Sequence, residues 1–90
     1  MAQRLRATVH GLVQGVGFRY SVISAAQGLG LKGFVENRPD GSVYVEAEGP
    51  AAMLDRLEAY LRRGPRMARV EELESERVDA TGEFGGFSWR

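Results

Sequence analysis

The sequence has no cysteine and a single histidine, and these absences exclude several kinds of chemistry. Without cysteine the chain can form no disulfide, no thiolate metal site and no cysteine nucleophile. One histidine, His10, cannot make a histidine-rich metal site. It shares its strand parity with Arg4 and Arg6, so we interpret it as a solvated surface residue rather than a general acid or base.

The sequence also has no excess of one charge and no long apolar run. Twelve basic residues balance twelve acidic ones, so no overall field attracts nucleic acid or a membrane surface. Any preference for anions must therefore be local. No stretch is long and apolar enough to serve as a signal sequence or to span a bilayer, so we expect a cytoplasmic protein without a membrane partner.

What the sequence does contain is an ordinary globular composition. Of its 90 residues, 43% are hydrophobic and 27% are charged. A chain of this length has room for one hydrophobic core and buries roughly 60–65% of its unfolded surface, enough to fold without cross-links. We predict a single domain over residues 1–90 that uses no metal and no other cofactor.

Apolar periodicity predicts most of the secondary structure. Alternation and helical spacing together predict strands at 4–13, 31–37, 42–48 and 87–89 and helices at 18–29 and 50–63. Pro50 suits the first helical position, and the run Arg38-Pro39-Asp40-Gly41 is a strong turn signal between two of the strands. Residues 68–78 fit neither period, and their glutamates would also suit a helix.

Alternation also divides the strands at 4–13 and 42–48 into an apolar face and a polar face. The polar face carries charged and hydroxyl side chains: Arg4, Arg6, Thr8, His10, Tyr44, Glu46 and Glu48. Opposite charges across neighbouring strands are each worth only a few tenths of a kcal/mol, so we interpret this face as solvated. The apolar face should then be covered by the helices.

Residues 13–19 (VQGVGFR) are the most informative stretch, between the first strand and the first helix. Gly15 and Gly17 allow backbone angles closed to other residues and leave room for a ligand close to the main chain. Successive N–H groups in such a turn, with the positive end of the following helix, suit a phosphate-sized anion. Arg19 would add a planar cation with several donors.

The same residues allow simpler interpretations. A tight turn that binds nothing would also need glycine, and the stretch matches neither a Walker loop nor a complete G-x-G-x-x-G pattern, because position 20 is Tyr20. Taken alone, Arg19 suits a surface ion pair, and Asn37, before the Pro-Asp-Gly turn, suits a turn former.

Two motifs together resemble the signatures of the acylphosphatase family. Residues 9–19 (VHGLVQGVGFR) resemble the first signature, and residues 33–37 (GFVEN), followed by 40–43 (DGSV), resemble the second. The resemblance extends over nearly the whole chain, as far as the terminal Phe87-Ser88-Trp89. One departure is Phe34, where tryptophan is frequent in the family.

The resemblance implies a fold and completes the element order. It expects a strand over residues 68–78, which we predict to be irregular or bulged. The order is then strand, helix, strand, strand, helix, strand and a short extra C-terminal strand. This pattern is typical of an α+β ferredoxin-like sandwich, βαββαβ, with two helices on one face of an antiparallel sheet.

The resemblance also implies an activity, the metal-independent hydrolysis of the carboxyl–phosphate bond of small acyl phosphates. By analogy with the family, Arg19 and Asn37 are the expected catalytic residues, binding phosphate and orienting water. The expected phosphate-binding residues are Gln14, Gly15, Val16, Gly17, Phe18 and Arg19. A carboxylate leaves readily, so such a substrate needs only a held phosphoryl group and one aligned water. Inorganic phosphate would be both product and inhibitor.

Two other functions use the same features. The ferredoxin-like fold is shared with RNA-recognition modules, and Lys32-Gly33-Phe34-Val35 resembles part of their aromatic strand motif. The second stacking aromatic and a basic surface are missing, so we expect no nucleic-acid partner. A non-catalytic anion-binding or regulatory module is the second alternative, as in related domains of larger carbamoyl-transfer maturation proteins. No apolar stripe is left over, so we expect a monomer.

Overall fold

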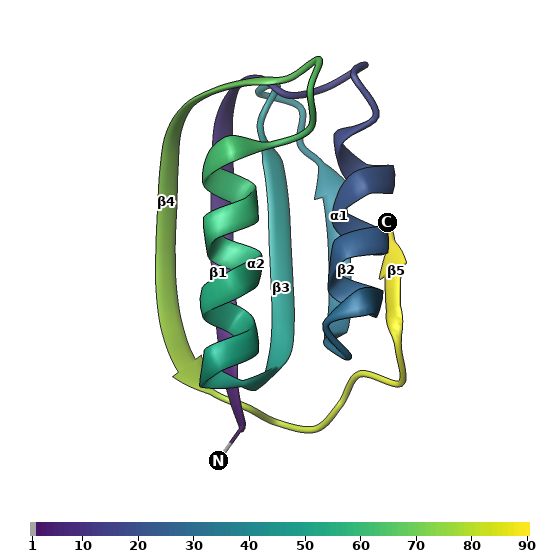
Figure 1. Cartoon of the computed structure of the whole chain (residues 1–90), viewed down its shortest axis with the longest axis vertical. Coiled ribbons are helices and arrows are strands. Elements are labelled where there is room, and N and C mark those ends of the chain that lie inside the picture. The colour runs from purple at the N-terminus through teal and green to yellow at the C-terminus, as the bar shows by residue number, and fades with distance from the viewer. Residues whose placement is uncertain (1) are drawn as a thin grey trace.

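A computed structural model describes residues 2–90 as a five-stranded sheet with two helices on one of its faces (Figure 1). The elements are β1 (Ala2–Leu12), α1 (Phe18–Gly28), β2 (Lys32–Asn37), β3 (Val43–Pro50), α2 (Ala51–Arg63), β4 (Arg69–Asp79) and β5 (Phe87–Trp89). Their order along the chain is the βαββαβ pattern with a short terminal strand, so the predicted ferredoxin-like sandwich is confirmed.

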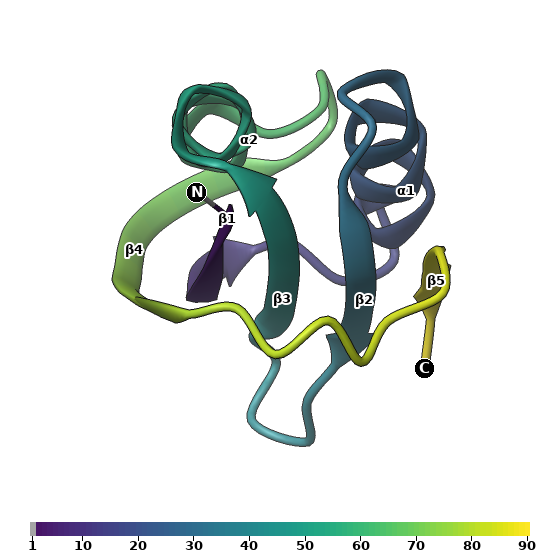
Figure 2. The ribbon, with the colours of Figure 1, turned by 90° about the horizontal axis from the view of Figure 1, so that it is seen from below.

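The sheet is mixed rather than antiparallel, which corrects one part of the prediction. Across the sheet the strands follow the order β4-β1-β3-β2-β5, and β5 pairs parallel with β2. Residues 80–86, the crossing segment, lead from β4 at one edge to β5 at the other (Figure 2). Because this connection traverses the whole sheet, β5 enters in the direction of β2, whereas the hairpin-linked strands run antiparallel.

The core lies between the sheet and the helices, as the alternation predicts. From β1, Leu5, Ala7 and Val9 point into it and are at most 1% exposed. From α2, the buried residues are spaced at helical intervals: Leu54, Leu57 and Leu61. Pro50 is the N-cap of α2 rather than its first helical residue. Within residues 2–90, no helix is long and apolar enough to cross a membrane.

One end of the polar sheet face is buried, so the prediction of a fully solvated face is wrong there. Arg4 and Glu48 are each only 7% exposed, whereas Arg6 stays exposed as predicted. The crossing segment covers this end, and Arg4 Nη2 donates to the Thr81 hydroxyl at 2.8 Å and contacts the Glu83 carboxylate. Strand parity identifies the face of a side chain but not what later covers it.

The buried charges at this end neutralise one another. Arg4 Nε donates to Glu48 Oε2 at 2.7 Å, and its Nη1 donates to Glu46 Oε1 at 3.0 Å. Burial acts to raise the pKa of Glu48, but backbone N–H donors from Thr81 and Gly82 and the Arg4 guanidinium lower that pKa to below its ordinary value. The Glu48 carboxylate thus fastens the crossing segment to β3 and β1.

Phe34 is buried on the same face and is not available to stack on a base. It is 6% exposed, with the Phe84 ring centroid 5.9 Å away and the Arg90 guanidinium carbon 3.7 Å above its ring. An RNA-recognition sheet needs its aromatic side chains exposed. The crossing segment therefore covers the aromatic residue on which the RNA-binding alternative depended.

Residues 68–78 form a strand with an irregularity, as predicted. In the pairing of β1 with β4, His10 lies opposite Glu72 and Gly11 lies opposite Val70, so Glu71 is an extra residue on β4. An extra residue of this kind is a β-bulge, which bends the strand and disturbs its alternation. The bulge explains why this segment does not show a strand period in the sequence.

Candidate active site

A hollow of about 150 Å³ lies where the loop before α1 meets the ends of β2 and β5. It is lined by Val13, Gly15, Gly17, Phe18, Arg19, Tyr20, Asn37 and Trp89. The structure therefore brings together Arg19 and Asn37, the two residues predicted to be catalytic. No carboxylate is among the lining residues, so Arg19 gives the hollow a net positive charge.

The loop backbone alternates in conformation where the sequence predicted a cradle of N–H groups. Gly15 and Gly17 both have a φ of 76°, in the left-handed region, and the residue between them does not have a positive φ. Alternation of this kind turns successive N–H groups toward one side and forms an anion-binding concavity. A Cβ at either glycine would meet no atom within 4 Å, so the glycines are needed for conformation rather than for space.

The N-terminus of α1 adds further free donors. Its first intrahelical hydrogen bond runs from Ser21 N to Gly17 O at 3.0 Å, and no side chain caps this end of the helix. The N–H groups of residues 18–20 therefore have no partner within the helix. These donors and the helix dipole both favour an anion at this end of α1.

Arg19 is held at the rim of the hollow by stacking rather than by a carboxylate. Its guanidinium carbon lies 5.4 Å from the centroid of the Trp89 ring. Within the chain from residue 2 to residue 90, Arg19 makes no ion pair. Its donors are therefore not committed to an internal anion.

Asn37 ends β2 on the side of the hollow. It pairs with Val43 of β3, which fixes the backbone that carries the side chain. Its Oδ1 is buried and has no hydrogen-bond partner among the described residues. An unpaired buried acceptor is costly, and this one belongs to a side chain that lines the hollow.

Gln14 and Val16, also predicted to contact phosphate, do not line the hollow. The Gln14 side chain instead donates from Nε2 to Arg38 O at 2.7 Å and to Ser42 O at 2.9 Å, which ties the loop to the β2–β3 turn. Val16 packs against the hydrophobic core. Both side chains anchor the loop, while the glycines between and beside them line its concave side.

Tyr20 and Trp89 line the hollow but were not predicted as site residues. They are 72% and 56% exposed, although both are large aromatic residues. Tyr20 lies off the apolar stripe of α1 that Phe18 and Val22 define, and that mismatch is the signal the sequence offers. Trp89 reaches the hollow only because β5 pairs with β2, opposite Val35.

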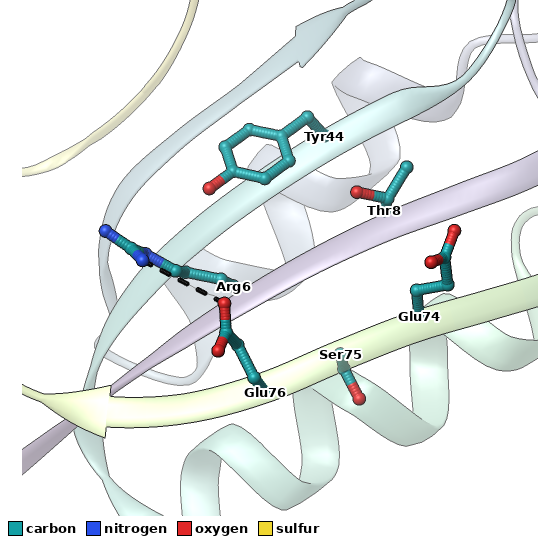
Figure 3. Close-up of a pocket in the computed structure, with 6 residues that line it drawn as sticks. All are labelled: Arg6, Thr8, Tyr44, Glu74, Ser75 and Glu76. Atoms are coloured by element: carbon teal, nitrogen blue, oxygen red, sulfur yellow. Dashed lines mark ion pairs between the residues drawn. The ribbon is translucent and has the colours of Figure 1, made fainter.

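A second hollow, the outer-face pocket, lies on the polar face of the sheet and is unsuited to phosphate (Figure 3). Its volume is about 300 Å³, and its cation, Arg6, pairs at 3.9 Å with Glu76, while Glu74 adds a second carboxylate. Burial and the Glu46 carboxylate raise the pKa of Tyr44 to about 12, so its hydroxyl stays protonated and donates to Glu46 at 2.7 Å. The net negative charge repels anions.

The family of the chain follows from comparison with known proteins. The family model for acylphosphatases matches residues 5–89. The chain belongs to the acylphosphatase family. An acylphosphatase of Mannheimia succiniciproducens is 48% identical over 80 residues, which are 89% of each chain. The crystal structure of the Bacillus subtilis acylphosphatase superposes with a TM-score of 0.93 at 36% identity, covering 100% of this chain and 99% of that one.

As a member of this family, the chain is a hydrolase of acyl phosphates. The same fold also occurs within a longer protein, because full-length HypF contains a region with a TM-score of 0.91 and 28% identity. That match covers 100% of this chain but 12% of the HypF chain. No group of three histidine, cysteine, aspartate or glutamate residues in the described part of the chain is arranged to hold a metal ion.

Proposed function

We propose that residues 14–19 and the Arg19 guanidinium hold the phosphoryl group of an acyl phosphate while Asn37 orients the attacking water. The observation that supports this is the shared hollow, which joins Arg19, Asn37 and the two loop glycines without any carboxylate. A doubly charged phosphoryl group is attracted by the guanidinium, by the loop N–H groups and by the helix dipole together.

The substrate needs little acid–base help. Water attacks phosphorus, the bond from phosphorus to the carboxyl oxygen breaks, and the products are a carboxylate and dihydrogen phosphate. Neither a carboxylate nor an imidazole lines the hollow, so the protons of the water remain on the phosphate oxygens. The protein contributes fixed donors for the charge on the equatorial oxygens and a fixed position for the water.

Asn37 suits the water because an amide offers both a donor and an acceptor without charge. Its amide group lines the hollow, where a hydrogen bond to the water would direct a lone pair of the water oxygen toward phosphorus. A carboxylate at this position would repel the substrate. The Gln14 hydrogen bonds to Arg38 O and Ser42 O keep the loop at a fixed distance from Asn37.

For the whole protein, we propose the following domain organisation, oligomeric state, metal requirement and inhibition. Residues 1–90 act as a single domain and as a monomer, the reaction needs no metal ion, and inorganic phosphate inhibits by occupying the hollow. The substrates are small acyl phosphates, and the hollow of about 150 Å³ has to hold only their phosphoryl group.

The test is turnover of benzoyl phosphate in the presence of a chelator, followed by substrate loss. Wild type should hydrolyse it, with competitive inhibition by inorganic phosphate. Arg19→Ala and Asn37→Ala should remain folded and lose roughly two orders of magnitude in kcat/KM, about 3 kcal/mol each, because each removes a preorganised group. Arg63→Ala is the control, since this exposed arginine does not line the hollow.

Full activity in Asn37→Ala would remove the water-orienting role. Equal losses in Arg19→Ala and Arg63→Ala would reduce the role of Arg19 to general surface charge. Loss of wild-type turnover on addition of chelator would contradict the metal-independent reaction.

A further inference from the structure

An apolar groove opens beside the hollow and shares two residues with it. It is lined by Tyr20, Ile23, Phe87, Ser88 and Trp89 and has a volume of about 250 Å³. Tyr20 and Trp89 also line the hollow, so the groove and the hollow are continuous. No charged side chain lines the groove.

Two of the three aromatic side chains of the groove are exposed to an unusual degree. Tyr20 is 72% exposed and Trp89 is 56% exposed, whereas Phe87 is 7% exposed and forms part of the floor. Ile23, one turn after Tyr20 on α1, is partly buried against the core. Exposed aromatic rings around a buried apolar floor are typical of surfaces that bind an apolar group.

The position of the groove relative to Asn37 suits one part of the substrate. In an in-line displacement, the attacking water and the leaving carboxylate lie on opposite sides of phosphorus. Asn37 lines the hollow but not the groove. An acyl group can therefore occupy the groove without displacing a water that Asn37 holds in the hollow.

We propose that this groove binds the acyl group of the substrate, with Tyr20 and Trp89 as its specificity-determining residues. The inference rests on the proposed function, since it takes the phosphoryl group to occupy the hollow. The favoured substrates are acyl phosphates whose acyl group is aromatic or branched and apolar, because flat or compact apolar groups gain most from contact with two aromatic rings. Acetyl phosphate, with a single methyl group, gains little.

The experiment compares phenylphosphonate with methylphosphonate as inhibitors of benzoyl phosphate hydrolysis. Both carry a phosphonate group, so a change in the ratio of their inhibition constants between wild type and a variant measures the contribution of the groove. In wild type, phenylphosphonate should bind about tenfold more tightly, a difference of about 1.4 kcal/mol. The ratio should fall to about twofold or less in Trp89→Ala and in Tyr20→Ala.

The ratio also separates the groove from the stacking of Trp89 on Arg19. Loss of that stacking would weaken both phosphonates equally and leave the ratio unchanged. Met67→Ala is the matched control, since Met67 is 72% exposed, as Tyr20 is, but lines neither the hollow nor the groove. Should Trp89→Ala not fold, Tyr20→Ala still decides the question.

Binding can be followed without turnover. Trp89 is the single tryptophan, so its fluorescence should change on saturation with phenylphosphonate more than with methylphosphonate. A wild-type ratio near one, or a tenfold ratio that persists in both variants, would overturn the proposal. A protein that binds both phosphonates with the expected ratio but hydrolyses no acyl phosphate would instead contradict the proposed function and leave the groove assignment standing.

Discussion

At the scale of single residues, Arg19 contacts an aromatic ring and keeps its hydrogen-bond donors free, which a lysine could not do equally well. Its guanidinium carbon lies 5.4 Å from the Trp89 ring centroid, and its donors remain free for an anion. A guanidinium can stack by its flat face and still donate two parallel hydrogen bonds from its edge. An ammonium group is a point charge that does neither well, so charge alone does not explain the choice of arginine.

Arg19→Lys should therefore lose most of the activity although it conserves charge. We expect kcat/KM for benzoyl phosphate to fall by about tenfold to a hundredfold, with a weaker inhibition by inorganic phosphate, because bidentate geometry is lost. Arg63→Lys provides a close control, since Arg63 lies 5.6 Å from the Tyr60 ring centroid but outside the hollow. Wild-type kinetics in Arg19→Lys would show that only charge is required at this position.

Which site residues the sequence could predict depended on how they reach the site. Arg19 and Asn37 belong to two short motifs, and the resemblance of these motifs to the family signatures predicted that both residues belong to one site. Trp89 enters the hollow through the parallel pairing of β5 with β2, and no local pattern specifies which strand a three-residue segment joins. The burial of Arg4 was missed for the same reason, because it depends on a segment almost eighty residues away in the chain.

At the scale of elements, the loop of residues 13–17 and the β2–β3 turn are joined by one side chain. Gln14 Nε2 donates to Arg38 O at 2.7 Å and to Ser42 O at 2.9 Å. The turn is itself ordered, since Asp40 Oδ1 accepts from Ser42 N at 2.9 Å and from Ser42 Oγ at 2.6 Å. Asn37 precedes this turn, so Gln14 links the backbone that presents N–H groups to the strand end that presents the amide.

Gln14→Ala should therefore reduce kcat although the Gln14 side chain lies outside the hollow. Losing two neutral hydrogen bonds should cost about 1–3 kcal/mol of unfolding free energy, and the loosened loop should lower kcat by about tenfold. Urea titration and steady-state kinetics measure the two effects. Gln27→Ala is the comparison, because the Gln27 amide makes a single contact of 3.4 Å with Phe87 O; equal effects of the two substitutions would count against a positioning role.

At the scale of the whole molecule, the crossing segment covers one end of the polar face and leads to β5 at the far edge of the sheet (Figure 2). It is fixed by Glu48, which accepts from Thr81 N at 2.8 Å and from Gly82 N at 3.0 Å, and by Arg4. The crossing segment leads into β5, and β5 carries Trp89, which lines the hollow. The buried ion cluster of Arg4 and Glu48 therefore also helps to hold Trp89 in place.

The ion cluster should give stability that depends on pH. The pKa of Glu48 is lower in the folded protein than its ordinary value of 4.5, so the ionised carboxylate stabilises the fold above that pH. This contribution should disappear as the pH falls through the folded-state pKa. At pH 7, Glu48→Gln should lower the unfolding free energy by about 2 kcal/mol, and the difference from wild type should shrink steadily below pH 4.5.

Urea titrations of both proteins between pH 7 and pH 3 measure this difference. Glu76→Gln is the matched control, because the Arg6–Glu76 pair also joins β1 to a neighbouring strand but is exposed. An exposed pair of this kind should contribute less than about 1 kcal/mol at any pH. A difference for Glu48→Gln that stays constant with pH would attribute its effect to packing rather than to ionisation.

The bulged strand β4 affects whether copies of this protein associate through the edges of their sheets. It forms an outer edge of the sheet, and its eleven residues include five carboxylates and two guanidinium groups. A second molecule adding a strand there would set two acidic rows side by side and meet a kinked, mismatched template at Glu71. Strand-by-strand association into fibrils is therefore disfavoured at this edge of the sheet, and neutralising its glutamates would favour it.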